Sequence, residues 1–415
     1  MTQTAASVIV VSRHRPEALQ LCLKALVLQD HPLFEIVVVA DPAGLAAARQ
    51  TGFDLKTVLF DQANISAARN LGLAQAAAPI VAFIDDDAVA DPFWLSRLVA
   101  PFEDPAVIAS TGFVRGRNGI SLQWQAGEVD AAGLDHPLPP VAARLPGQPG
   151  RAVKTQGTNC AFRKSALLAI GGFDPALHFY LDEADVNLRL VGHGLTAIVP
   201  EAQVHHAYAA SARRGADRIP LSLQEIAASI AVFLRRHAPE MAEAESVPAI
   251  EAQRARVAAL LRRRTISQDQ ASTLLTSLAD GWDDGMRRQI GQFPDLAAPP
   301  PGFLRLAGTG PRPGRLIAGR IWQKAGLLNA AAAAAGRGEI VTVLCLSPTP
   351  RAHHVVFDPR GFWLQSGGLF GWSDRTPPRL RLQSFSARLA AEARRIAPLR
   401  PIDRIERFSA IPPLT

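Results

Sequence analysis

The most informative segment of the chain is Val81-Ala82-Phe83-Ile84-Asp85-Asp86-Asp87. Its apolar half predicts a buried strand of a parallel sheet, and ligands of open α/β sheets collect at the carboxyl ends of such strands. Adjacent carboxylates repel one another, so a cation is needed to hold three of them together at low cost. Oxygen ligands suit Mg²⁺ or Mn²⁺. The junction favours a divalent-metal site over the plainer alternative, an acidic turn before a helix near Trp94.

Three further apolar runs precede this strand, at residues 7–11, 35–39 and 55–60. Helical spacing of leucines follows the first run, at residues 17–28. Strands alternate with helices in this way when right-handed crossovers build a doubly wound, mostly parallel sheet. The sequence therefore predicts an α/β fold of Rossmann-like type for the N-terminal half.

We expect three domains or segments. Residues 1–215 form the α/β domain, residues 216–300 a helical segment with a proline-rich linker, and residues 301–415 a small α+β domain of unknown role. The last region has a clear apolar strand at residues 340–346 and a segment rich in glycine and tryptophan. Its aromatic side chains are interpreted as a small core, rather than a sugar-stacking or membrane-facing surface: Trp363, Phe370 and Trp372.

The composition is that of a globular protein, with 48% hydrophobic and 20% charged residues among 415. No apolar stretch reaches the length of about 18 residues that a transmembrane helix needs. The N-terminus lacks the pattern of a secretory signal. The 3 cysteines are scattered, which argues against a disulfide framework or a zinc site and favours a reducing cytoplasm.

The formal net charge is +7, and arginines recur in doublets and triplets. A basic surface attracts polyphosphate substrates or anionic lipid headgroups, so we expect peripheral contact with the inner face of a membrane. Nucleic acid is not an expected partner, because no aromatic side chains or nucleic-acid motif accompany the charges. Genomic bias explains such usage equally well. The clusters are Arg213-Arg214, Arg235-Arg236, Arg262-Arg263-Arg264 and Arg287-Arg288.

The order of several short motifs resembles the GT-A nucleotide-sugar-dependent glycosyltransferases of family 2, over about the first half of the chain. The resemblance implies a GT-A fold, a nucleotide-sugar donor, and Mn²⁺ or Mg²⁺ as cofactor. It further implies a glycan or lipid-linked acceptor, in cell-surface glycan or polysaccharide synthesis. The matching residues are 8–12 with Arg15-Pro16, 37–41, 67–72, 83–87, 171–174, 182–185 with Arg189, and Pro200 with His206.

The same resemblance assigns individual roles. It gives the metal to Asp85 and Asp87, completed by His206, with His205 as the rival histidine. A divalent ion there would neutralise the charge that builds on the leaving diphosphate. The donor-binding residues implied are Ser12, Arg13, Arg15, Asp41, Arg69, Asp85, Asp86 and Asn159.

The catalytic base falls in the acidic run at residues 182–185. By resemblance Glu183 stands at the base position, and Asp182 is the alternative. A carboxylate that takes the acceptor proton opposite the leaving group implies inversion at the anomeric carbon.

Two interpretations from other classes stay open. Asp85 and Asp87 suit the nucleophile loop of a haloacid-dehalogenase-like phosphatase, which also needs Mg²⁺. Against it, two βα units precede the aspartates, and the later acidic run opens a helix instead of ending a strand. A non-catalytic nucleotide-sugar-binding module is the other alternative, and the intact set of Asp87, Glu183 and Asp185 speaks against it.

Overall fold

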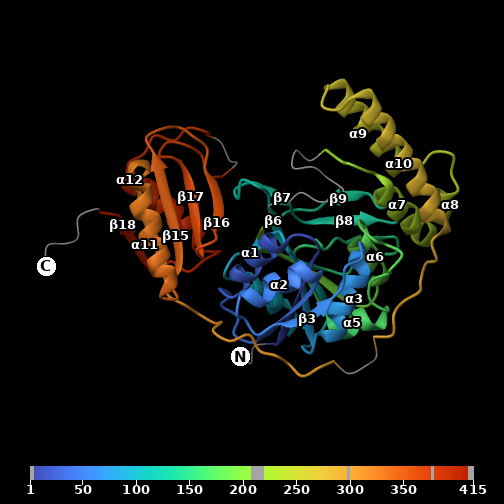
Figure 1. Ribbon diagram of the computed structural model, residues 1–415, viewed down its shortest axis with the longest axis horizontal. Helices are drawn as coiled ribbons and strands as arrows, with labels where there is room; N and C mark the ends of the chain where they lie inside the picture. Colours follow the sequence, from blue (N-terminus) through green and yellow to red (C-terminus); the bar gives the residue numbers. More distant parts are fainter. Residues whose placement is uncertain (1–3, 207–218, 297–299, 375–377, 410–415) are drawn as a thin grey trace.

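The computed structural model describes residues 4–206, 219–296, 300–374 and 378–409. It shows an α/β body, a helical segment that leads into a projecting hairpin, and a second, smaller α/β unit beside the body (Figure 1). Arg213-Arg214, one of the predicted basic clusters, lies outside the described residues. Within them, no helix is long and apolar enough to cross a membrane.

The body is built on a ten-stranded sheet, and the apolar runs of the sequence form its parallel half in the order β3-β2-β1-β4. Both faces of these strands are buried because helices cover both, which explains their continuous apolar sequences. The first two helices pack on one face and the third on the other. The elements are β1 (Ala6–Ser12), α1 (Pro16–Leu26), β2 (Phe34–Ala40), α2 (Pro42–Gln50), β3 (Lys56–Leu59), α3 (Ile65–Gln75) and β4 (Ile80–Asp85).

The other half of the sheet is mixed. β12 is antiparallel to both β4 and β6, while β13 returns parallel to β6 and then pairs with the short β5. The mostly parallel α/β prediction is confirmed, with this antiparallel insertion as a feature the periodicity did not reveal. The elements are β5 (Ala88–Ala90), α4 (Trp94–Val99), η1 (Ala100–Glu103), β6 (Val107–Arg115), β7 (Leu122–Trp124), β10 (Ala143–Leu145), β12 (Cys160–Arg163), α5 (Lys164–Ala169), α6 (Asp182–Arg189) and β13 (Leu195–His206).

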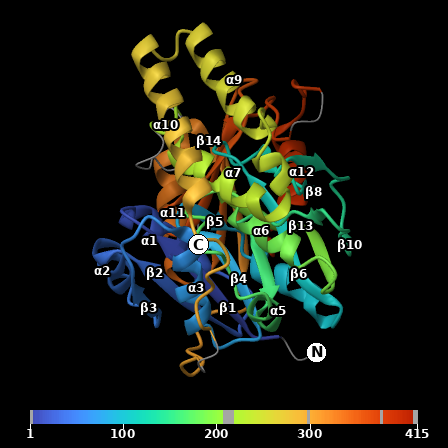
Figure 2. The ribbon, with the colours of Figure 1, turned by 90° about the vertical axis from the view of Figure 1, so that its right-hand side faces the viewer.

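The helical segment shares a hydrophobic core with the body. Val129 and Ala152 from a small three-stranded sheet and Leu181 and Ala184 around α6 pack into the same cluster as its helices. Its last two long helices project from the body as a hairpin (Figure 2). The elements are β8 (Gly127–Asp130), β9 (Asp135–Pro137), β11 (Arg151–Val153), α7 (Gln224–His237), α8 (Pro239–Ala242), α9 (Pro248–Arg262) and α10 (Gln268–Arg287).

The C-terminal unit has a five-stranded sheet in the order β16-β17-β15-β14-β18. All neighbours are parallel except β16 and β17, and α11 and α12 cover opposite faces. Strands and helices therefore alternate more regularly than the expected α+β arrangement. Trp363 is buried, as its interpretation as a core residue requires. The elements are β14 (Gly314–Arg320), η2 (Ile321–Gln323), α11 (Lys324–Gly336), β15 (Ile340–Ser347), β16 (His354–Asp358), β17 (Phe362–Gly368), α12 (Phe385–Ile396) and β18 (Arg404–Arg407).

Candidate functional site

Asp85, Asp87 and His206 converge at the carboxyl end of β4. Each offers a ligand atom, and these atoms lie within 4.8 Å of one another. His206 Nε2 is 3.2 Å from Asp87 Oδ1 and 3.9 Å from Asp85 Oδ2. The antiparallel pairing of β5 with the end of β13 brings the histidine to the aspartates. Two carboxylates and one imidazole are a donor set that fits Mn²⁺. Mg²⁺ also accepts the two carboxylates but prefers oxygen ligands to the histidine nitrogen.

Strand geometry separates the two candidate histidines. Successive side chains of a strand point to opposite faces, so His205 turns away when His206 faces the aspartates. His205 lies instead 3.1 Å from Asp91, and its ring centroid is 4.5 Å from that of Trp363. Burial lowers the pKa of His205 to about 4, although Asp91 opposes the shift.

Asp86 points into the protein rather than toward the other two aspartates. It is fully buried, accepts a hydrogen bond from Ser12 Oγ at 2.7 Å, and pairs with Arg15 at 2.5 Å. Arg15 also lies 3.4 Å from Asp87. Burial raises the pKa of Asp86 to about 7, with Arg15 opposing and the neighbouring aspartates adding to the rise. Ser12 and Asp86 thus lie beneath the candidate metal centre, and Arg15 links them to it.

Two other predicted donor residues lie at the ends of β1 and β2, on the same edge of the sheet as Asp85. Asp41 caps α2: its Oδ2 accepts from the Ala43 amide at 3.2 Å, and its Oδ1 from the His14 amide at 2.9 Å. Arg13 pairs with Asp61 at 2.8 Å near the surface. Asp41 therefore has the structural role of a turn residue, whatever it contributes to binding.

Asn159 does not belong to a ligand surface, contrary to the sequence prediction. Its side chain is fully buried, its amide nitrogen donates to the Phe113 and Ala202 carbonyls, and its oxygen accepts from Trp94 Nε1 at 2.7 Å. These bonds join the residue just before β12 to β6, β13 and α4. The sequence prediction placed Asn159 in the donor site, but in this fold its side-chain amide hydrogen-bonds to groups of the core.

Arg69 connects the aspartates to the acidic run. It projects from α3, forms a close ion pair with Asp182, donates to the Gly157 carbonyl at 3.0 Å, and lies 3.8 Å from Asp85. Its guanidinium also lies over the rings of Phe83 and Phe173. Asp182, Asp85 and the nearby Glu183 raise the pKa of Arg69 against the effect of burial, so it stays charged.

The two candidate bases differ in environment. Asp182 is buried and committed to Arg69, whereas Glu183 is only partly buried. Burial and the neighbouring Glu183 carboxylate raise the pKa of Asp182, while Arg69 opposes the shift. A Cβ added at Gly157 would meet the Glu183 carboxyl carbon at 3.4 Å, so Glu183 lies against the turn before β12, in which Thr158 Oγ1 accepts from the Asp85 amide at 3.4 Å.

The entry into α6 is strained. Tyr180 and Leu181 adopt φ values of 79° and 63°, in the left-handed region that side chains with a Cβ rarely occupy. Two such residues in succession cost of order 1–3 kcal/mol each and persist where the surrounding structure enforces them. Strain of this kind often accompanies sites where a side chain must be held in one orientation, which is the requirement for a base at residues 182–183.

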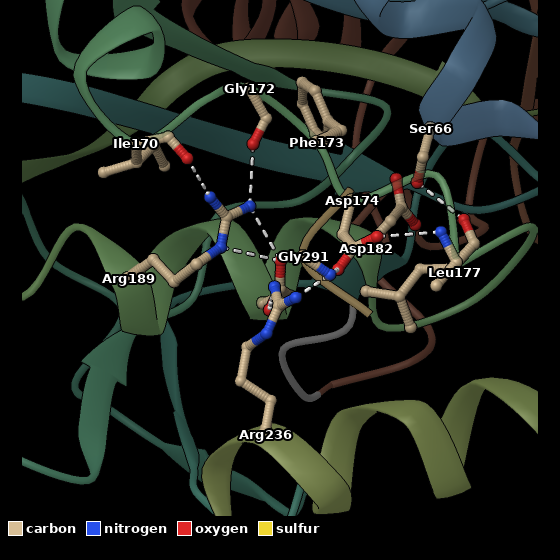
Figure 3. A network of polar contacts seen from close by, with 12 residues as sticks. Ser66, Ile170, Gly172, Phe173, Asp174, Leu177, Asp182, Arg189, Arg236 and Gly291 are labelled. Atoms are coloured by element: carbon tan, nitrogen blue, oxygen red, sulfur yellow. Dashed lines mark hydrogen bonds and ion pairs between the residues drawn. The ribbon is translucent and has the colours of Figure 1, made fainter. Parts of the chain in front are cut away.

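Two arginines, Arg189 of α6 and Arg236 of α7, hold α6 in place through a network of polar contacts (Figure 3). Arg189 donates to the Ile170 carbonyl at 2.6 Å and the Gly172 carbonyl at 2.7 Å, and pairs with Asp185 at 2.7 Å. Arg236 of α7 pairs closely with Asp174 and, at 2.9 Å, with Asp185. Burial alone would raise the pKa of Asp185, but His237 and the two arginines lower it to about 2.

Sequence reasoning identified Arg189 but missed Arg236, which lies in the helical segment. The sequence signal for Arg236 was the doublet Arg235-Arg236 at the end of an otherwise apolar helical stretch.

We expect Arg236→Met to lower the free energy of unfolding by about 3–5 kcal/mol, because the substitution leaves two buried carboxylates, Asp174 and Asp185, without their shared cation. Urea titration measures the change.

The matched control is Arg254→Met on α9. Arg254 pairs with Glu251 at 3.3 Å, and both side chains are more than half exposed. Its expected change is within about 0.5 kcal/mol. Equal losses in the two variants would show that the network under α6 does not stabilise the fold.

Residues 7–171 match the sequence family Glycosyl transferase family 2. Two pre-mycofactocin glycosyltransferases, from Mycobacterium tuberculosis strains CDC 1551 / Oshkosh and ATCC 25618 / H37Rv, are each 29% identical over 173 residues. The match covers 38% of this chain and 35% of each relative. The chain therefore spans about a third of the length of the curated relatives it matches.

Solved structures show weaker likeness. GalNAc-T7 with UDP, GalNAc and Mn²⁺ gives a TM-score of 0.45 at 16% identity, over 56% of this chain and 48% of that one. The mannosyltransferase PcManGT from Pyrobaculum calidifontis with GDP-Man and Mn²⁺ gives 0.42 at 18% identity, over 69% of this chain and 88% of that one. The likeness to Glycosyl transferase family 2 therefore rests on the sequence match over residues 7–171.

Proposed function

We propose that residues 7–171, which match Glycosyl transferase family 2, form a domain of that family, and that the chain transfers a sugar from a nucleoside diphosphate sugar to an acceptor hydroxyl. One observation carries the proposal: within such a domain, Asp85, Asp87 and His206 place ligand atoms within 4.8 Å of one another. Arg69 lies 3.8 Å from Asp85 and also pairs with Asp182 of the acidic run. The donor phosphates and the acceptor would meet between the metal-ligand group and the acidic run.

The proposed cofactor is Mn²⁺ or Mg²⁺, held by Asp85, Asp87 and His206. When bound, the ion supplies positive charge to the leaving diphosphate. Arg15 and Arg69 add positive charge on either side of the aspartates, so the site suits a polyphosphate. The remaining donor contacts that we propose come from the strand ends at Arg13 and Asp41, on the same edge of the sheet.

Glu183 is the proposed base, and inversion the proposed stereochemistry. Asp182 is less suited to accept a proton from a sugar hydroxyl, because its carboxylate is buried against Arg69. Glu183, one residue on, is only partly buried and keeps its carboxyl group beside Gly157. A carboxylate in this position contributes typically about 10²–10⁴-fold to a step that removes a proton.

The experiment that tests this function is a thermal-shift panel of nucleotide sugars with Mn²⁺, repeated with chelator. Binding to the folded state raises the unfolding temperature, and the shift grows with concentration relative to Kd. We expect one nucleotide class to stabilise the protein with Mn²⁺ only. Release of phosphate without any acceptor would instead support the phosphatase, and donor binding without transfer would support the binding module.

The acceptor is proposed to be a glycan or lipid-linked sugar, approached at an anionic membrane face. Three arginines of two predicted basic clusters are used internally, because Arg235 bonds two carbonyls and Arg236 and Arg288 form ion pairs. The fourth, Arg287, is exposed. A group of exposed arginines lies on α9 and the turn that follows, on the projecting hairpin (Figure 2). They are Arg254, Arg256, Arg262, Arg263 and Arg264.

We therefore expect the protein to float with anionic vesicles at low salt. Each basic residue close to such a surface is worth about 1 kcal/mol, so replacing Arg262, Arg263 and Arg264 with glutamine should abolish flotation. The charge-matched control replaces three exposed arginines elsewhere with glutamine: Arg49, Arg144 and Arg360. If the two triple variants float equally, the hairpin is not the contact.

A further inference from the structure

Asp91 is a buried carboxylate four residues after Asp87, one of the candidate metal ligands. It follows β5 directly and is fully buried. Its Oδ1 accepts from Arg400 Nε at 2.6 Å, and its Oδ2 lies 3.1 Å from His205 Nε2. Arg400 comes from the C-terminal unit, 309 residues further along the chain. A buried carboxylate of the body is thus paired with a cation from another part of the molecule.

Trp363 of β17 completes this arrangement. The guanidinium carbon of Arg400 lies 3.8 Å from the Trp363 ring centroid, and the ring of His205 lies 4.5 Å from it. Trp363 is 1% exposed and Arg400 3%, so the contacts are shielded from water. In such surroundings an arginine stacked on an aromatic ring and bonded to a carboxylate is held in one orientation.

Apolar packing surrounds the ion pair. Val89 of β5 and Ile120 share a hydrophobic cluster with Val355, Phe357 and Trp363 of the C-terminal unit. In Figure 1 the C-terminal sheet stands beside α1, with β16 and β17 on the side nearer the body. Asp91 remains charged within this cluster: burial would raise its pKa, but Arg400 and His205 together hold it well below the usual value. The body and the C-terminal unit are therefore joined by a specific contact.

The contact between the body and the C-terminal unit lies on one face of the β5–β13 ladder, and the metal-ligand candidate His206 lies on the other. β5 begins immediately after Asp87, and its residues pair in the order Val204↔Ala90, His205↔Val89 and His206↔Ala88. Alternate side chains of the ladder point in opposite directions. Val89 and His205 face the C-terminal unit, while His206 faces the aspartates.

We propose that the C-terminal unit positions the metal site, with Trp363 and Arg400 as the positioning residues. They hold Val89, Asp91 and His205, and so fix the short ladder between Asp87 and His206. The proposal rests on the proposed function in that it needs a metal at these ligands. Three residues of β5 paired at one edge are too few to be rigid alone, and a divalent ion binds best when its ligands are already in place.

The test measures Mn²⁺ binding by the full chain without nucleotide, from the loss of the electron paramagnetic resonance signal of free Mn²⁺. Two variants disturb the contact differently. Trp363→Leu removes the ring, and Arg400→Lys keeps the charge beside Asp91 but loses the planar stack. We expect each to raise the Kd for Mn²⁺ about tenfold, as changes behind metal ligands commonly do. Arg400→Lys is the milder change and decides the question if Trp363→Leu does not fold.

The matched control is Val355→Ala, which thins the same interface at an aliphatic side chain that cannot hydrogen-bond to Asp91 or His205. It leaves the hydrogen bond that the Val355 amide donates to the Asn118 carbonyl. It should lower the unfolding temperature without changing the Kd for Mn²⁺. If Arg400→Lys binds Mn²⁺ like the wild type, or Val355→Ala weakens binding equally, the positioning role is refuted. Absence of Mn²⁺ binding in the wild type would instead refute the proposed metal site, and the positioning role with it.

Discussion

Glu183→Gln should reduce glycosyl transfer by about two to four powers of ten while donor binding stays within about twofold of wild type. The substitution keeps the size and hydrogen-bonding ability of the side chain but removes its capacity to accept a proton. Glu183 is suited to this role because the residue is only partly buried and its carboxyl carbon lies close to Gly157. Single-turnover transfer and a separate titration of nucleotide diphosphate measure the two quantities.

Asp182→Asn is the matched comparison for the base. It is equally conservative in shape, but it weakens the pair with Arg69 and should act mainly on orientation, with a smaller loss of transfer. If Asp182→Asn proves crippling and Glu183→Gln mild, the two roles are exchanged. If neither matters while the metal site is essential, a carboxylate base and the inverting stereochemistry are both wrong.

Asp87→Asn should abolish the Mn²⁺-dependent part of nucleoside diphosphate binding, a loss of about 100-fold in affinity. Asp87 is buried, lies 3.2 Å from His206 and points at the same position as Asp85. Its replacement removes both a ligand oxygen and a negative charge that attracts the cation. Calorimetric titration with Mn²⁺ and with chelator measures the difference.

Asp61→Asn provides the control for Asp87→Asn. Asp61 is an exposed carboxylate that pairs with Arg13 and His14, just after the end of β1. It is not among the converging ligands Asp85, Asp87 and His206. It should leave Mn²⁺-dependent binding unchanged. Equal affinity with and without chelator in all three proteins would show that the nucleotide site needs no metal.

The parallel half of the sheet could be predicted because its residues carry the signal locally. β1, β2 and β4 are continuous apolar runs, since helices cover both of their faces. The direction of β12 escaped prediction, because four residues of a buried strand look the same in a parallel and in an antiparallel ladder. Direction is set by the connections, which local periodicity does not encode.

The acidic site residues were identified from order and type, but their environments depend on distant partners. Asp182 and Glu183 look equivalent in sequence, and Arg69, 113 residues away, distinguishes them by pairing with one. Asn159 was misassigned because an amide that bonds core carbonyls and one that bonds a ligand look alike in sequence. Arg236 and Arg400 were missed for the same reason, since each meets its carboxylate only after the chain has folded.

The most direct measurement is anomalous diffraction from crystals grown with Mn²⁺ and the nucleoside diphosphate that the thermal-shift panel selects. We expect a single strong manganese peak at coordination distance from Asp87 and His206, with Asp85 beside it and the diphosphate completing the ligands. Glu183 should lie across the site from the metal, with room for a sugar between them. A bound nucleotide without manganese at this position, or manganese held by other residues, would contradict the central claim.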